Sequence, residues 1–204
     1  MSDPIYDPSL PPEGPDAAAG QERPGAGLFD WLQTAMACIL CAVLVFSCFA
    51  RLSRVDGDSM HPTLLDGELT LVRTMGYRPQ AGDIVVLNKT TARLGSWDSP
   101  QAIVKRVIAT GGQVVDIDYG TGTVYVDGVA LDEPYLAEEM YQPYSPYMAL
   151  THWEVPEDHV FVLGDNRNAS SDSRDDRLGP VHEDFVLGKL VLAFWPFDRF
   201  GGVD

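Results

Sequence analysis

The sequence predicts a mostly β protein: an antiparallel, barrel-like or sandwich-like domain behind one N-terminal transmembrane helix. The first observation is a run of 20 residues, 31–50, without a charged side chain. This is the length of helix that crosses a hydrocarbon core about 30 Å thick. The second is that short β-branched runs, separated by turn residues, fill the chain after it. Such runs without helical crossovers are typical of antiparallel sheets.

The N-terminal part divides into a tail and the charge-free run. Residues 1–30 are rich in Pro, Gly, Ala and acidic residues and have no apolar period, so we expect a disordered tail. A buried soluble helix and a cleaved signal peptide are alternatives for residues 31–50. A signal peptide has a basic start and a shorter apolar core, whereas here a long acidic tail comes first. We therefore predict a retained transmembrane helix over 31–50 and a separate domain over 51–204.

The domain contains six runs with the composition of strands, at 69–73, 83–87, 103–108, 114–118, 123–126 and 160–163. Asp127-Gly128 follows the fifth run directly and is a strong hairpin signal. Residues 131–155 contain three prolines, so we expect an irregular excursion there.

Charge and cysteine usage exclude several classes of protein. The formal net charge is −16, which argues against a nucleic-acid partner because phosphate binding needs clustered Lys and Arg. The three cysteines lie inside the charge-free run, so the rest of the chain has no disulfide and no cysteine metal site. Arg167 occupies a ligand position of a calcium loop counted from Asp165, so that pattern fails. The four histidines form no spaced pair for zinc. We expect no metal and no cofactor.

A serine and a lysine stand out as candidates for chemistry. Ser59 lies in Asp56-Gly57-Asp58-Ser59-Met60-His61-Pro62-Thr63-Leu64, shortly after the charge-free run. A serine needs a base to take its proton. A lysine is such a base only when neutral, and desolvation lowers a lysine pKa from its reference value of about 10.4. Lys105 has apolar neighbours within 103–108 and can meet this condition. Alone, Ser59 also fits an ordinary turn, and Lys105 an edge-strand lysine in solvent.

Four motifs, which follow the charge-free run, extend this pattern in a fixed order. They are Ser-Met-x-Pro-Thr-Leu from Ser59, Gly-Asp-Ile-Val from Gly82, Val-Lys-Arg-Val-Ile from Val104, and Gly-Asp-Asn-Arg from Gly164 with a trailing Ser-x-Asp-Ser-Arg. This set, over roughly Val55 to Phe197, resembles the bacterial type I signal peptidase family. That family removes the signal peptides of exported proteins at the outer face of the cytoplasmic membrane.

The resemblance implies a role for each matching residue. Ser59 corresponds to the nucleophile and Lys105 to the general base of a Ser-Lys endopeptidase. Ser170 corresponds to the hydroxyl that orients the lysine. The residues that hold the site through ion pairs are Asp165, Arg106, Asp172 and Arg174. We expect the substrate pocket and the oxyanion hole at Gly57, Asp58, Met60, Leu64, Ile103 and Val104.

Two positions depart from the family pattern. Many members have a serine two residues before the nucleophile, whose hydroxyl completes the oxyanion hole, and this chain has Gly57 there. The hole then rests on the Ser59 backbone N–H and a neighbouring group. In the turn after the lysine motif, Gln113 replaces the usual acidic residue, which we expect to affect structure rather than chemistry.

The resemblance also implies a location and partners. We expect a single-pass protein of the cytoplasmic membrane with an extracytoplasmic catalytic domain, acting on signal peptides of exported preproteins. The charge bias points the other way, because Arg23 alone precedes the charge-free run while Arg51 and Arg54 follow it. The bilayer is the second expected partner. Residues 194–197 and Phe200 are candidates for contact with the lipid interface, or alternatively for a core strand with a turn.

Three alternatives remain. A self-cleaving SOS-type repressor protease shares Ser-Lys chemistry, but it lacks a membrane anchor. A catalytically inactive, membrane-anchored β-domain would act in binding or assembly, and the presence of both Ser59 and Lys105 argues against it. A Ser-His mechanism through His61 is the third, although we expect that side chain to point away from Ser59.

Overall fold

The protein is described by a computed structural model, which covers residues 26–88 and 102–203. Helix α1 (Ala26–Phe49) begins before the predicted start at residue 31 and ends one residue before the predicted end at residue 50. Its segment Gly27–Leu44 has a mean hydropathy of 1.7, so α1 is long and apolar enough to cross a membrane. Most of the predicted tail, 1–25, lies outside the described residues.

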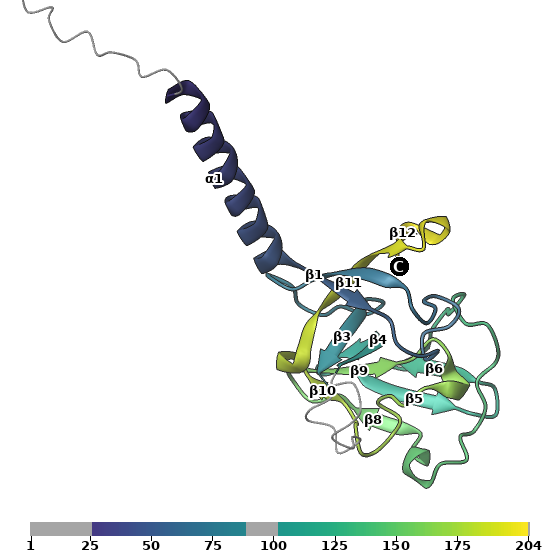
Figure 1. Cartoon of the computed structure of the whole chain (residues 1–204). Coiled ribbons are helices and arrows are strands. Elements are labelled where there is room, and N and C mark those ends of the chain that lie inside the picture. The colour runs from purple at the N-terminus through teal and green to yellow at the C-terminus, as the bar shows by residue number, and fades with distance from the viewer. Residues whose placement is uncertain (1–25, 89–101, 204) are drawn as a thin grey trace, which may run out of the picture. The chain divides into compact units, whose positions relative to one another are not determined.

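The rest of the described chain forms two antiparallel sheets (Figure 1). The larger sheet is ordered β1-β2-β11-β3-β4-β9-β10, and β12 also pairs with β11. Its strands are β1 (Ala50–Arg54), β2 (Leu69–Arg73), β3 (Ile84–Asn88), β4 (Ala102–Thr110), β9 (His159–Leu163), β10 (Val181–His182), β11 (Val186–Trp195) and β12 (Gly201–Gly202). The smaller sheet contains β5 (Val114–Asp118), β6 (Thr123–Val126), β7 (Val129–Ala130) and β8 (His152–Glu154). Short 3-10 turns are η2 (Pro146–Met148), η3 (Arg167–Ala169), η4 (Glu183–Phe185) and η5 (Phe197–Arg199).

The mostly β, antiparallel fold class is confirmed, and all six predicted runs are strands within about two residues of the predicted ends. The predicted hairpin joins β6 to β7, with positive φ at both Asp127 and Gly128. These angles match the turn type whose twist suits two-residue hairpins. The excursion over 131–155 is less irregular than predicted, because it contains η2 and β8.

Strand β11 was not predicted as a whole, yet it pairs with β2, β3 and β12 in the larger sheet. It contains Phe194 and Trp195, so these two residues belong to a strand and not to a separate surface loop. Beyond the strand, Phe197 and Phe200 are 73% and 63% exposed. Trp195 is 48% exposed and stacks edge-on against Phe197. The exposed aromatic group at the C-terminal end therefore starts at Trp195.

Three clusters of buried apolar side chains form the core. One joins the smaller sheet to β9, another packs β3 and β4 against β9 and β10, and the third packs residues 55–64 against β3 and β11. Met60 and Leu64 are 1% and 0% exposed in this third cluster. Burial of these two side chains fixes the loop that contains Ser59 against the sheet.

Candidate active site

Ser59 lies in a loop between β1 and β2 whose two ends are joined by hydrogen bonds. The N–H of Val55 donates to the carbonyl of Glu68 (2.8 Å), and the N–H of Gly67 donates to the carbonyl of Val55 (3.0 Å). Within the loop, the N–H of Gly57 donates to Asp66 Oδ1 (2.9 Å). Gly57 has a φ of +85°, a region that disfavours any residue with a Cβ. A serine at this position would be strained.

Lys105 reaches the Ser59 hydroxyl from β4. Its Nζ lies 2.7 Å from Ser59 Oγ and donates a second hydrogen bond to the carbonyl of Val104 (2.8 Å). The side chain is 3% exposed, although it ends in an amine. The two residues are 46 positions apart in the chain. The structure therefore brings together a serine and a buried amine at hydrogen-bonding distance.

The loop after β9 fixes the backbone on the other side of Ser59. The N–H of Asn166 donates to the Ser59 carbonyl (3.0 Å), and Asn166 Nδ2 donates to the carbonyl of Asp58 (3.1 Å). Gly164 allows this approach, because a Cβ there would lie 2.4 Å from the Ser59 oxygen and 2.2 Å from Ser170 Oγ. The missing side chain is thus a requirement of the site.

Ser170 lies beside Ser59 but makes no strong polar contact. Its Oγ is buried and has no hydrogen-bond partner among the described residues. Its contact with Asp172 helps to lower the pKa of that carboxyl, but the geometry falls short of a hydrogen bond. The predicted orientation of the lysine by this hydroxyl stays a prediction.

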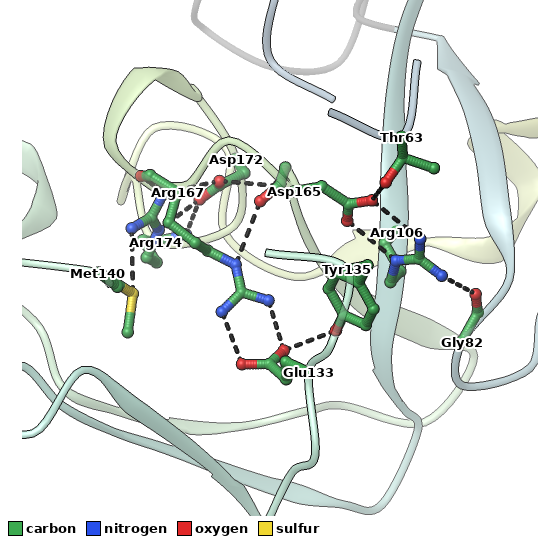
Figure 2. A network of polar contacts seen from close by, with 11 residues as sticks. Thr63, Gly82, Arg106, Glu133, Tyr135, Met140, Asp165, Arg167, Asp172 and Arg174 are labelled. Carbon is green, nitrogen blue, oxygen red and sulfur yellow. Dashed lines mark hydrogen bonds and ion pairs between the residues drawn. The ribbon is translucent and has the colours of Figure 1, made fainter. Parts of the chain in front are cut away.

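An ion pair connects the loop after β9 with the lysine strand β4, and Thr63 of the Ser59 loop binds to it (Figure 2). Arg106 donates from Nε and Nη2 to the two oxygens of Asp165 (2.9 and 2.8 Å), and Thr63 donates its hydroxyl to the same carboxylate. Arg106 and Asp165 are 3% and 2% exposed. The guanidinium also lies 3.9 Å from the ring centre of Tyr135. Asp165 therefore holds the Ser59 loop and the loop after β9 together against β4.

A second buried network, which contains Asp172, Arg174, Arg167 and Glu133 (Figure 2), also binds the backbone of Gly164. Asp172 accepts the N–H of Gly164 (3.1 Å) and is paired through both oxygens with Arg174. Arg167 donates to the carbonyl of Gly164 (3.1 Å) and is paired with Glu133. Burial alone would raise the pKa of the Asp172 carboxyl, but the adjacent Arg174 guanidinium outweighs it and lowers that pKa. The carboxylate therefore stays charged and keeps its hold on Gly164.

Arg199 of η5 ties the C-terminal segment to the Ser59 loop. Its Nη2 donates to the carbonyls of Pro62 and Thr63 (both 3.2 Å), and its Nε lies 2.7 Å from Glu68 Oε1. Glu68 is 2% exposed. Because the middle of the loop and its C-terminal end both contact this one guanidinium, Arg199 restricts the position of Ser59.

The predicted pocket residues do not share one surface. Gly57 and Asp58 are exposed, whereas Met60 and Leu64 are buried in the core. Ile103 and Val104 are half-buried and pack against different core clusters. The exposed His61 forms no side-chain hydrogen bond to any described residue, and it lines a hollow with Ala137, Glu138, Asp165 and Asn166. This geometry gives the Ser-His alternative no support.

Several site residues were missed by sequence reasoning. Thr63 and Arg167 lie inside motifs that the sequence shows, so their positions were a usable signal. Asn166 lies in the same motif as Arg167 and carried the same signal. The others come from the end of the Ser59 loop, from the excursion over 131–155 and from the C-terminal segment, and they reach the site only through tertiary contacts: Glu68, Glu133, Tyr135 and Arg199.

Comparison with known proteins is consistent with this geometry. A family model described as "Signal peptidase, peptidase S26" matches residues 28–195. The chain is 35% identical over 170 residues to a probable signal peptidase I-1 of Synechocystis sp., covering 81% of this chain and 82% of that protein. It is 31% identical over 188 residues to a signal peptidase IB of Staphylococcus aureus, covering 85% of this chain and 92% of that protein. A crystal structure of a signal peptidase I from Enterococcus faecalis V583 is 32% identical, covers 56% of this chain and 97% of that one, and superposes with a TM-score of 0.42.

Proposed function

The chain belongs to the signal peptidase family, peptidase S26, and has the function of a signal peptidase I; on this premise we propose that Ser59 is its nucleophile and Lys105 its general base. Enzymes of this kind are serine endopeptidases that act on the signal peptides of preproteins. The main support for the assignment is the 2.7 Å distance between Lys105 Nζ and Ser59 Oγ. Burial disfavours the charged form of an amine, and Lys105 is 3% exposed.

The proposed reaction has two halves. In the first, neutral Lys105 accepts the proton of Ser59 while Oγ attacks the carbonyl carbon of the scissile bond. The lysine then gives this proton to the leaving amine, which departs as the new N-terminus of the cleaved protein. In the second half, water attacks the ester on Ser59 and passes its proton to Lys105. The ester breaks, Ser59 regains the proton, and the signal peptide leaves with a free carboxylate.

We assign the stabilisation of the negative oxygen to the backbone N–H of Ser59. This N–H makes no hydrogen bond to another residue in the described part of the chain, whereas the N–H of Gly57 is already bound to Asp66. A single well-placed donor is worth about 3 kcal/mol of transition-state stabilisation. Because Gly57 has no hydroxyl, this proposal makes the Ser59 N–H the main donor.

The N-terminal part of β4, residues 102–105, is the proposed binding edge for the substrate. Residues 102–105 pair with β3 on one side. On the other side, β9 pairs with β4 only from Arg106 onward, so no described strand covers residues 102–105 there. An extended peptide can add to such an edge through main-chain hydrogen bonds. This edge ends at Lys105, which puts a bound peptide next to the Ser59 loop. Gln101, which we also expected at this edge, lies outside the described residues.

Membrane attachment through α1 belongs to the same proposal. Its large apolar side chains from Leu28 to Leu44 are exposed, as expected for a helix whose surroundings are lipid. We place the β domain on the extracytoplasmic side of the cytoplasmic membrane, in line with export, and assign the exposed Trp195, Phe197 and Phe200 to the lipid interface. Nucleic acid is not a partner in this proposal, because a net charge of −16 opposes the binding of phosphates.

The proposed function is tested with a preprotein and the full-length enzyme in membranes. Wild type should release the mature protein, and Ser59→Ala should not, because the variant lacks the attacking oxygen. Gly202→Ala is a suitable control, since a Cβ at Gly202 meets no atom within 4 Å. Cleavage by Ser59→Ala at the wild-type rate would refute the assignment of the nucleophile. A folded wild type that cleaves no preprotein would support the inactive-domain alternative.

A further inference from the structure

A basic hollow lies at the end of β2, away from Ser59. It is lined by Arg73, Tyr77, Arg78, Gln80, Asp83 and Lys189 and has a volume of about 560 Å³. This volume is in the range of sites that hold small molecules. The mechanism above uses none of these side chains.

The hollow offers two unpaired arginines. Asp83 is occupied, because it pairs with Lys189 and accepts hydrogen bonds from the Tyr77 hydroxyl and the Gln80 N–H. Arg73 and Arg78 are exposed, and neither forms an ion pair with a residue that the structure describes. The Arg73 guanidinium reaches only the carbonyl of Gly76, at 3.5 Å. Within the described part of the chain, two positive charges are therefore without a counter-ion, although the net charge of the chain is −16.

Asp83 does not compete for the arginines. Burial and the hydrogen bond to Asp83 raise the pKa of Tyr77 well above its ordinary value, so the phenol stays a donor to this carboxylate. Glu183, whose charge also acts on Tyr77, does not line the hollow. The anion that fits two free guanidinium groups is one with several oxygens, and phosphate suits their planar geometry best.

Chain connectivity places this hollow beside the end of α1. Arg73 pairs in register with Ala50, the residue that follows the helix, and the N–H of Thr74 donates to the carbonyl of Phe49 (3.1 Å). If α1 spans the bilayer, as the proposed function requires, Arg73 lies within one strand spacing of the point where the chain leaves it. Leu52, two residues along β1 from the partner of Arg73, and Met75, two residues after Arg73, are 70% and 48% exposed. Apolar side chains beside cations match the boundary between headgroups and acyl chains.

We propose that this hollow binds the phosphate of an anionic phospholipid, held by Arg73 and Arg78. Its position at the end of the anchor and its apolar surroundings favour a lipid over free phosphate. The bound headgroup would offset the repulsion between an acidic chain and an anionic membrane surface. It would also fix the end of β2, the strand that follows the Ser59 loop, at the level of the headgroups.

The test measures lipid retention by the full-length protein. Wild type, Arg73→Gln/Arg78→Gln and Arg51→Gln/Arg54→Gln are extracted from vesicles of equal parts phosphatidylglycerol and phosphatidylcholine, and retained lipids are counted by native mass spectrometry. The third protein is the matched control, because Arg51 and Arg54 are exposed and close to α1 but do not line the hollow. In Arg73→Gln/Arg78→Gln, the pocket variant, we expect the preference for phosphatidylglycerol over phosphatidylcholine to fall at least tenfold. One charge-assisted hydrogen bond is worth roughly that factor. In the control, the same preference should fall less than fivefold.

Two results would overturn the proposal. One is an unchanged preference in the pocket variant or an equal loss in the control, which would indicate diffuse attraction without a site. The other is displacement of the retained lipid by millimolar inorganic phosphate, which would indicate an anion site without lipid specificity. Peptide cleavage in detergent by the same preparations separates this proposal from the proposed function, because that activity should be equal in all three proteins. Loss of cleavage in wild type would contradict the proposed function and leave the lipid count as an independent result.

Discussion

Replacing Asp165 by asparagine should destabilise the domain strongly, because it removes the charge that faces Arg106. Both side chains are at most 4% exposed, and both carboxylate oxygens accept from the guanidinium. The amide of asparagine keeps one acceptor but turns a donor toward the guanidinium. Arg106 keeps its hydrogen bond to the carbonyl of Gly82 and its contact with Tyr135, and neither neutralises it.

The expected cost follows from burial. A buried charge that loses its partner costs about 3–5 kcal/mol, whereas an exposed pair is worth less than about 1 kcal/mol. A domain of this size has a free energy of unfolding of about 5–15 kcal/mol, so Asp165→Asn should remove about a fifth or more of it. Asp116→Asn is the matched control, because its pair with His152 is 45% and 58% exposed. The double variant Asp165→Asn/Arg106→Met should recover part of the loss, since it also removes the positive charge that faces position 165.

Urea unfolding of the full-length protein, followed by tryptophan fluorescence, measures these differences. The free energies of wild type, Asp165→Asn, Arg106→Met and the double variant form a cycle whose coupling should exceed about 1 kcal/mol. A loss below about 1 kcal/mol in Asp165→Asn, or additive effects in the double variant, would refute the view that this pair joins the loop after β9 to the lysine strand.

Three further predictions concern the backbone, the second ion pair and the C-terminal clamp. Gly164→Ala should reduce turnover at least tenfold, because its Cβ would meet the Ser59 carbonyl at 2.4 Å; steady-state rates equal to those of Gly202→Ala would contradict this. The lowered pKa of Asp172 means that its pairing stabilises the fold at neutral pH and that this contribution is lost as pH falls below about 4. Asp172→Asn should therefore be less stable than wild type in urea at pH 7, with a difference that shrinks toward pH 3, and a constant difference would argue against the pairing. Arg199→Ala should lower kcat severalfold with little change in KM, since it frees the Ser59 loop, and a change in KM alone would show that Arg199 contacts substrate instead.

The sequence was most informative where structure is local. Short β-branched runs between turn residues predicted six strands. Both the alternation of apolar side chains and the turn residues that end each run can be recognised within a few residues. Strand β11 has neither signal in full: it contains Gly188 and Lys189, and bulges shift its register against both β2 and β3. Its burial alternates over residues 188–191 and loses the alternation at Leu192, so a period of two extends over only part of the strand.

The site was predictable to the extent that it lies in contiguous motifs. Ser59 and Lys105 each lie in a recognisable motif, and the structure brings them to hydrogen-bonding distance. The pairing of Arg167 with Glu133 spans 34 residues, and the contact of Arg199 with the carbonyl of Pro62 spans 137. No local pattern specifies such partners, because they are set by the path of the whole chain.

The central claim is that Lys105 activates Ser59, and covalent labelling tests it most directly. A peptide mimic with an electrophilic carbonyl is incubated with full-length wild type and Lys105→Met across a range of pH, and the adduct is located by mass spectrometry of fragments. Methionine nearly preserves the shape of lysine but accepts no proton. The account predicts an adduct on Ser59 of wild type, formed faster as pH rises because more of the lysine is neutral, and almost none in Lys105→Met. An adduct on Ser59 that forms equally fast in Lys105→Met, or a wild-type rate that does not rise with pH, would contradict it.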